Sequence, residues 1–172
     1  LVIGSKLTIS EPLGSFHHNP LFHGNHLFFI AGGAGITPAK SMIPELLKKK
    51  SNVQITLIHS NSHENDVIFK DFFSQLAEKH DRFKFYSFIT RPSPQYRGLA
   101  GRISGEIFLE LLPIFSDPFF YICGPSPFNI HCLNLLTSYD INNRRILVDI
   151  NGPPRHPELL SQWPKNHSPN TV

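Results

Sequence analysis

The sequence predicts an α/β fold, namely a doubly wound sheet of five parallel strands in the order 3-2-1-4-5. From residue 27 onward, short apolar segments alternate with longer amphipathic ones, which is the pattern of strand–helix–strand units with right-handed crossovers. Two of the apolar segments also run directly into glycine turns that lead into helical patterns. The chain has 172 residues, which suffices for one core and is too short for two ordinary domains.

The elements are expected in a regular order along the chain. Strands are expected at residues 27–31, 53–58, 83–89, 119–122 and 145–150, with a separate short strand at 6–10. Helices are expected at residues 38–50, 66–79, 104–112 and 127–138. The helix assignments rest on periodicity, because Phe69, Phe72, Phe73 and Leu76 follow the spacing of one buried helical face.

Composition and charge argue against several classes of protein. The formal charge is +3, and the one tight basic run, residues 48–50, falls at the end of an expected helix, where cations suit the helix dipole. No basic stripe with interleaved aromatics indicates nucleic-acid binding, and no apolar run approaches the ~20 residues of a membrane span. Cys123 and Cys132 lack metal-site or disulfide-framework spacing. A soluble, cytoplasmic protein segment without a metal is expected.

The first glycine turn follows the strand expected at 27–31. Gly32, Gly33 and Gly35 permit turn conformations that are closed to other residues and let a bound group approach the backbone. Thr37 is expected to cap the next helix and Pro38 to be its first residue, which leaves amide donors and a positive dipole end at the turn. A pyrophosphate suits such a site. The third glycine of the GxGxxG fingerprint is missing, so a plain strand-to-helix turn remains an alternative.

The second glycine turn has the same organisation. Cys123, Gly124 and Pro125 end an apolar strand, with Ser126 as the expected cap and Pro127 as the expected first helical residue. In a 3-2-1-4-5 sheet the first and fourth strands are neighbours, so both turns would face one crevice and could hold one extended ligand. In that crevice Cys123 is either a small apolar spacer or a contact for a planar ring.

Four segments occur in the order GGAGITP, LIHSNSHENDVIFKDF, TRPSPQYRGLAGRIS and YICGPSPF. Together they resemble the pyridine-nucleotide domain of the ferredoxin–NADP⁺ reductase superfamily, particularly bacterial NADH oxidoreductases that feed electrons to an iron–sulfur domain. The resemblance covers about residues 6–150. It implies an NAD(P)-binding domain at 27–150, preceded at 1–26 by the tail of an FAD-binding barrel and a connection. Residues 151–172, rich in Pro, Asn and His, are expected to be irregular.

The resemblance also implies roles for individual residues. The residues implied around the pyrophosphate and nicotinamide are Gly32, Gly33, Gly35, Thr37, Pro38, Cys123, Gly124 and Pro125, with Thr37 and Cys123 closest to the reacting ring. His59, Ser60 and Asn61 would lie along the adenosine ribose, and Arg91 and Arg102 would contact phosphates. The sequence has no arginine near the end of the second strand that could pair with the 2′-phosphate of NADPH, so NADH is favoured over NADPH.

The implied activity is hydride transfer from NADH to FAD and onward electron transfer to an iron–sulfur or other acceptor protein. FAD would be held by an upstream domain, so this chain alone is expected to be inactive. A truncated or repurposed dinucleotide-binding or protein-interaction module without turnover remains an alternative, because LVDINGPP replaces the family's Glu-x-Phe ending. The histidines at 17, 18, 23 and 26 raise the question of zinc, but no ligand-spaced cysteine or carboxylate accompanies them, so a polar connection is favoured.

Overall fold

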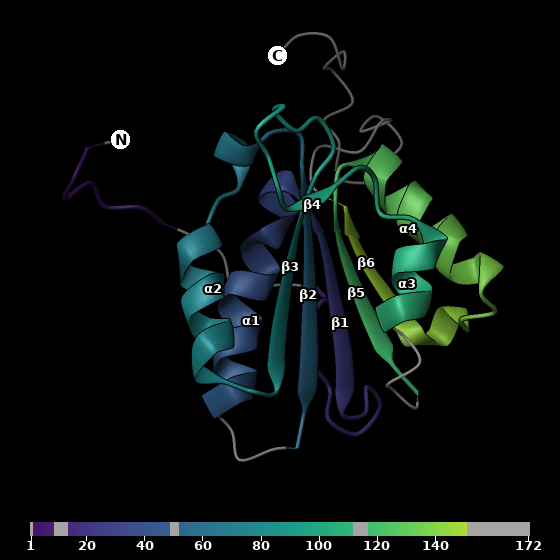
Figure 1. Ribbon diagram of the computed structural model, residues 1–172. Coiled ribbons are helices and arrows are strands. Elements are labelled where there is room, and N and C mark those ends of the chain that lie inside the picture. Colours follow the sequence, from purple (N-terminus) through teal and green to yellow (C-terminus); the bar gives the residue numbers. More distant parts are fainter. Residues whose placement is uncertain (1, 9–13, 49–51, 112–116, 151–172) are drawn as a thin grey trace, which may run out of the picture.

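The computed structural model describes residues 2–8, 14–48, 52–111 and 117–150 (Figure 1). Its strands are β1 (His26–Gly32), β2 (Gln54–Asn61), β3 (Phe83–Ile89), β4 (Leu99–Ala100), β5 (Phe119–Gly124) and β6 (Ile146–Ile150). Its α-helices are α1 (Thr37–Lys48), α2 (Lys70–Lys79), α3 (Gly105–Leu111) and α4 (Ser126–Ser138). Three short 3₁₀ turns complete the described elements: η1 (Gly33–Ile36), η2 (Glu64–Asp66) and η3 (Asn143–Arg145).

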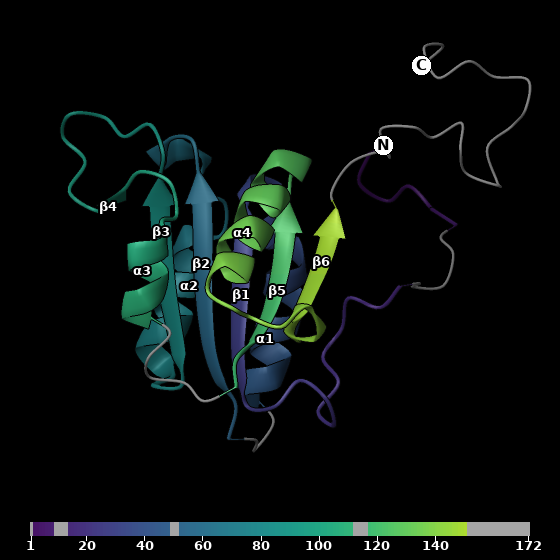
Figure 2. The same cartoon turned by 90° about the vertical axis from the view of Figure 1, so that its right-hand side faces the viewer.

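The strands form one parallel sheet in the order β4-β3-β2-β1-β5-β6, and their carboxyl ends meet at one edge (Figure 2). The predicted order 3-2-1-4-5 is confirmed as β3-β2-β1-β5-β6. The predicted count of five strands was wrong, because β4 pairs with Phe88 and Ile89 at the open edge. This strand has two residues, too few for an alternating pattern to reveal it in the sequence.

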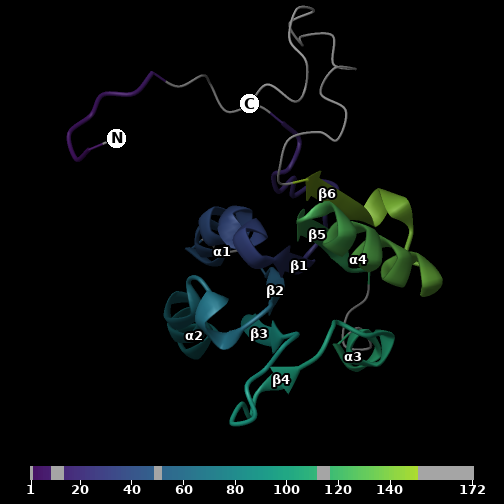
Figure 3. The same ribbon diagram turned by 90° about the horizontal axis from the view of Figure 1, so that it is seen from above.

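Helices cover both faces of the sheet. α1 and α2 lie on one face, and α3 and α4 lie on the other (Figures 1 and 3). Alternate residues of β1 enter two separate cores, since Leu27 and Phe29 pack on the first side and Phe28 and Ile30 on the second. A strand that is buried on both faces is apolar throughout, which explains the continuous run at the start of the glycine turn. Among the described residues, none of the helices has the length and apolarity to cross a bilayer.

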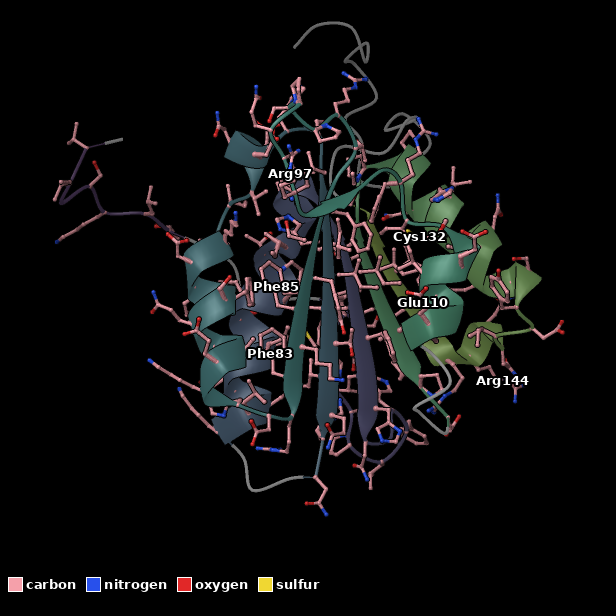
Figure 4. The ribbon with its side chains drawn as sticks, in the orientation of Figure 1. Phe83, Phe85, Arg97, Glu110, Cys132 and Arg144 are labelled. Carbon is pink, nitrogen blue, oxygen red and sulfur yellow. The ribbon has the colours of Figure 1, made fainter. Side chains whose placement is uncertain are left out.

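The helix expected at 66–79 is interrupted near its start. The chain forms η2 first, and α2 begins only at Lys70 after Phe69 has adopted a left-handed conformation with φ of 59°. Phe69 therefore does not belong to the buried helical face and is 40% exposed. Phe73 does occupy that face, and Phe83 and Phe85 of β3 lie toward it (Figure 4), with ring centroids 6.1 and 5.6 Å from that of Phe73.

The segment before β1 packs against the sheet without forming a strand. Residues 6–8 of the expected strand 6–10 are irregular, and residues 9–10 lie outside the described residues. His23 stacks on Phe119 of β5 with ring centroids 3.8 Å apart. The guanidinium of Arg145 donates to the Phe22 carbonyl at 2.9 Å. The predicted irregular tail at 151–172 also lies outside the described residues.

Candidate functional site

The two glycine turns lie side by side at the carboxyl edge of the sheet. A Cβ atom on Gly124 would lie 3.2 Å from Gly32 Cα and 2.6 Å from a ring atom of Phe128. A Cβ atom on Gly35 would collide with the backbone carbonyl of Cys123. The glycines therefore let the backbones of β1, η1 and β5 approach more closely than side chains would permit.

A groove of about 470 Å³ opens above these turns. We call it the edge groove, and the residues that line it include Gly33, Ala34, Ser60, Asn61, Asp66, Thr90 and Pro125. A second hollow of about 230 Å³, the side hollow, is lined by Arg102, Ile103 and His131 and shares Ser60, Thr90 and Phe128 with the groove. Backbone amides, hydroxyls and one guanidinium thus line these two adjoining depressions, which is a donor set that suits an extended anionic ligand, and the Asp66 carboxylate also lines the groove.

The first turn differs in detail from the expected helix cap. Gly33 adopts φ of 53° and begins η1, so a 3₁₀ turn separates β1 from α1. Thr37 is already helical, with φ of −58° and ψ of −43°, and its hydroxyl donates to the Ala34 carbonyl at 2.7 Å. The prediction of Thr37 as an N-cap was therefore wrong, because η1 occupies the position in which a cap would accept a bond. Thr37 is exposed, and Pro38 follows it within α1.

The second turn also lacks the expected cap. Ser126 is the first residue of α4, Pro125 occupies the N-cap position, and no side chain caps the helix. Pro127 still lies in the first turn of α4, where a missing amide hydrogen costs nothing. Pro125 is exposed and lines the edge groove, as does the half-buried Phe128 behind it.

His59, which was expected along the adenosine ribose, does not line the edge groove. It is fully buried at the end of β2, and its Nε2 donates to the Gly33 carbonyl at 2.9 Å. Burial lowers the pKa of His59, so the imidazole is neutral at pH 7. Its neighbours Ser60 and Asn61 do line the groove. At the polar end of β2, one side chain is therefore buried in a hydrogen bond to η1 and two side chains line the groove.

The thiol of Cys123 points away from the edge groove. The residue is 3% exposed, and its Sγ donates to Asp149 Oδ2 of β6 at 3.9 Å. It adjoins a void of about 10 Å³ beside Phe16 and Pro38. Pro38 and Asp149 also line a separate depression of about 580 Å³, together with the segment at residues 14–17. Cys123 therefore faces the N-terminal segment, and the contact with the groove comes from Pro125.

The two predicted phosphate-binding arginines separate in the structure. Arg102 lines the side hollow, whereas Arg91 does not line either depression. The Arg91 carbonyl accepts a hydrogen bond from His63 Nδ1 at 3.1 Å. The Ser93 amide donates to Glu64 Oε1 at 2.8 Å, and this bond lowers the pKa of Glu64. These bonds connect the loop after β2 to the loop after β3. Arg91 contributes to that connection through its backbone carbonyl.

Sequence reasoning missed Ala34, Asp66, Thr90 and Phe128 as residues of the site. Phe128 shares a helical face with Cys132, and that spacing alone favours a place in the core for both. In the structure Cys132 is core, whereas the half-buried Phe128 packs against the core and lines both depressions. The position of Phe128 directly after the second glycine turn was the sequence feature that could have identified it as a site residue. Within the described ranges, no group of three or more His, Cys, Asp or Glu residues is arranged to hold a metal ion. His18 and His23 instead contact the Tyr121 hydroxyl, at 3.2 and 2.6 Å.

Comparison with known proteins assigns this arrangement to a family. The model of the oxidoreductase NAD-binding domain matches residues 29–132, which is more than half of the chain. NADH-cytochrome b5 reductase 1 of Dictyostelium discoideum is 32% identical over 150 residues, covering 86% of this chain and 52% of the relative. A component of the Na⁺-translocating NADH-quinone reductase of Haemophilus ducreyi is 30% identical over 155 residues, covering 87% of this chain and 37% of the relative.

Among solved structures, the CS-b5R domains of human Ncb5or in the NAD⁺ form superpose with a TM-score of 0.72 at 25% identity, covering 83% of this chain and 43% of that one. The chain thus spans about half, or less, of the length of these relatives. The family match takes in most of β1, both glycine turns and the start of α4, which are the elements that build the edge groove. The chain belongs to the oxidoreductase NAD-binding domain family of the ferredoxin–NADP⁺ reductase superfamily.

Proposed function

We propose that this chain is the nucleotide-binding half of an NADH-dependent flavoprotein reductase, which positions nicotinamide for hydride transfer to FAD and onward electron transfer. The observation that carries the proposal is the single groove formed where the two glycine turns meet. The names of two relatives from different organisms, a cytochrome b5 reductase and a component of a quinone reductase, both specify NADH.

The residues of the edge groove fit a dinucleotide. Gly33 has a positive φ, and nothing lies within 4 Å of where its Cβ would be, so a phosphate can approach this backbone. The amides at the start of η1 lack partners inside their own turn and can donate to such a phosphate. Ser60, Asn61 and Thr90 offer hydroxyl and amide groups along the groove, and Arg102 adds a positive charge beside it.

In this function the chain binds and orients, while the cofactors supply the redox chemistry. Nicotinamide supplies a hydride when the reduced dinucleotide is bound. The backbone of η1 would hold the pyrophosphate, and Pro125 would border the ring end of the groove. Cys123 and Asp149, joined by their own hydrogen bond, would support the second glycine turn from beneath. We assign FAD to a separate domain that precedes this one in the functional protein.

The preference for NADH over NADPH is part of this proposal. Asp66 of η2 lines the edge groove beside Ser62, at the end of β2 where the adenosine ribose is expected. Its carboxylate would repel a 2′-phosphate there. Arg102 lies in the neighbouring side hollow, and its positive charge would attract a phosphate. Asp66 therefore favours NADH, while Arg102 acts in the opposite direction.

Calorimetry on this chain with NADH, NADPH and ADP tests the proposal. We expect binding of all three ligands, with NADH bound more tightly than NADPH. The polypeptide joined to its flavin-binding domain is expected to be yellow and to oxidise NADH with an artificial electron acceptor. Failure to bind any of the three nucleotides would refute the proposal. Binding without NADH oxidation by the yellow protein would instead favour a dinucleotide-binding module that has no turnover.

A further inference from the structure

We propose that His59 is a positioning residue that fixes the peptide between Gly33 and Ala34, so that the Ala34 amide faces the edge groove as a phosphate donor. This inference rests on the proposed function and gives His59 a role within it that differs from the ribose contact expected from the sequence. His59 would not touch the ligand itself, since it is fully buried beneath η1. It would act through the Gly33 carbonyl, to which its Nε2 donates at 2.9 Å.

The direction of the Ala34 amide follows from the geometry of the peptide unit. In a trans peptide the carbonyl and the next N–H lie in one plane and point in opposite directions. The structure contains no cis peptide bond among the described residues. With the Gly33 carbonyl turned toward the buried imidazole, the Ala34 N–H therefore points away from it. Ala34 is exposed and lines the edge groove. We therefore infer that its amide, which points away from the buried imidazole, faces the groove.

The conformation of Gly33 makes the hydrogen bond from His59 necessary. At φ of 53° glycine has mirror-related alternatives of similar energy, so the peptide that follows it can turn over at low cost. A turned peptide would present the Gly33 carbonyl to the groove, and an oxygen lone pair there would repel a phosphate. The hydrogen bond from His59 selects the arrangement that attracts one. The Thr37 hydroxyl donates to the next carbonyl, that of Ala34, at 2.7 Å, so side chains hold the first two carbonyls of η1.

The protonation of His59 is consistent with this role. A carbonyl oxygen only accepts hydrogen bonds, so Nε2 must carry the hydrogen and Nδ1 must be unprotonated. Nδ1 is buried and has no hydrogen-bond partner among the described residues. A second proton would thus be buried as a charge with an unpaired N–H, which burial disfavours. The neutral imidazole is therefore a fixed donor and does not exchange protons with a ligand.

Two variants separate the hydrogen bond from the volume of the side chain. His59→Gln carries an amide donor near the position of Nε2, whereas His59→Leu fills similar space without a donor. ADP and adenosine serve as probes with and without the pyrophosphate, measured by calorimetry on the whole chain. We expect His59→Leu to weaken ADP binding roughly tenfold or more, as for a lost bond to a charged group. His59→Gln should stay within about threefold of the wild type, and adenosine binding should not change.

His80→Leu, at the end of α2, is the matched control and should bind ADP like the wild type. The proposal is overturned if His59→Leu binds ADP normally, if His59→Gln is as weak as His59→Leu, or if adenosine affinity falls in parallel. Should His59→Leu fail to fold, His59→Asn replaces it, because its amide is too short to reach Gly33 and must bind ADP more weakly than His59→Gln.

A second measurement does not depend on any ligand. The imidazole ¹⁵N chemical shifts of His59 must show a protonated Nε2 and an unprotonated Nδ1 at pH 7, and the opposite tautomer would refute the tie to Gly33. If the wild type binds no nucleotide while this tautomer is observed, the proposed function fails and the His59–Gly33 bond survives. If the wild type binds ADP and the variants do not differ, only the positioning role fails.

Discussion

The stability of the protein is expected to fall in mild acid because of His23. Nδ1 of this ring accepts hydrogen bonds from the Tyr121 hydroxyl at 2.6 Å and from the Asn19 amide at 3.1 Å. Protonation of Nδ1 would remove the lone pair that both donors use. Burial, together with the charges of His18, His17 and Arg145, lowers the pKa of His23 to about 4. The replacement that isolates this effect is His23→Gln, whose amide oxygen accepts hydrogen bonds but does not titrate.

The magnitude follows from the difference in pKa between the folded and unfolded chains. The unfolded chain binds the proton near pH 6.5 and the folded chain only near pH 4, so the unfolded state binds more protons between these values. The stabilisation is therefore complete above pH 6.5 and is lost as the pH falls toward 4. Linkage gives a loss of about 2 kcal/mol at pH 5 and about 3 kcal/mol below pH 4. These figures are upper values, because solvent near His23 screens part of the interaction.

Urea unfolding at pH 7.5 and pH 5.0 measures this loss. We expect His23→Gln to lose about 2 kcal/mol less than the wild type between the two pH values. His80→Gln, at the end of α2 and away from the contacts of His23 with Tyr121 and Asn19, is the control and should lose as much as the wild type. If His23→Gln and the wild type lose equal stability, His23 is not the group that titrates and the reasoning is refuted.

Three further outcomes are expected. Gly35→Ala should lower the free energy of unfolding by about 1–3 kcal/mol or more, because its Cβ meets the Cys123 carbonyl; an unchanged urea midpoint would contradict the close approach of the two turns. Phe73→Ala should cost about 3–5 kcal/mol in the same assay, since the ring is fully buried, and a cost below that of a surface change would show that the α2 face is poorly packed. Arg102→Ala should weaken ADP binding about tenfold at low salt, and calorimetry showing equal affinity would remove Arg102 from the phosphate site.

The parts of the fold that the sequence predicted are those with a strong local pattern. β1 is apolar on both faces and ends in glycines, so its type and its end were both readable. β3 was predicted with its observed bounds. β4 was not, because two residues become a strand only through pairing with β3. Phe69 had the right spacing for α2, but the turn η2 and a left-handed backbone override that spacing.

The candidate site was predictable by region and less so by side chain. The neighbouring positions of the two glycine turns follow from strand order, which the alternation of elements determines. The direction of a single side chain depends on the turn beside it. A histidine at a strand end is equally consistent with a ribose contact and with a buried tie, and only the path of η1 decides for His59. Arg91 likewise offers a guanidinium in the sequence, while the structure uses its backbone carbonyl.

The position of β1 at the centre of the sheet has a consequence for folding. Leu27 pairs with Ile55, which a single crossover brings back, and also with Phe119, which arrives only after most of the chain has been placed. Closing the longer loop costs more entropy, so the pairing of β1 with β5 is expected to form late. The edge groove needs both glycine turns and therefore exists only after that step. A nucleotide bound there would stabilise the pairing of β1 with β5, which is the pairing expected to form late. It would thereby lower the rate at which the whole sheet unfolds.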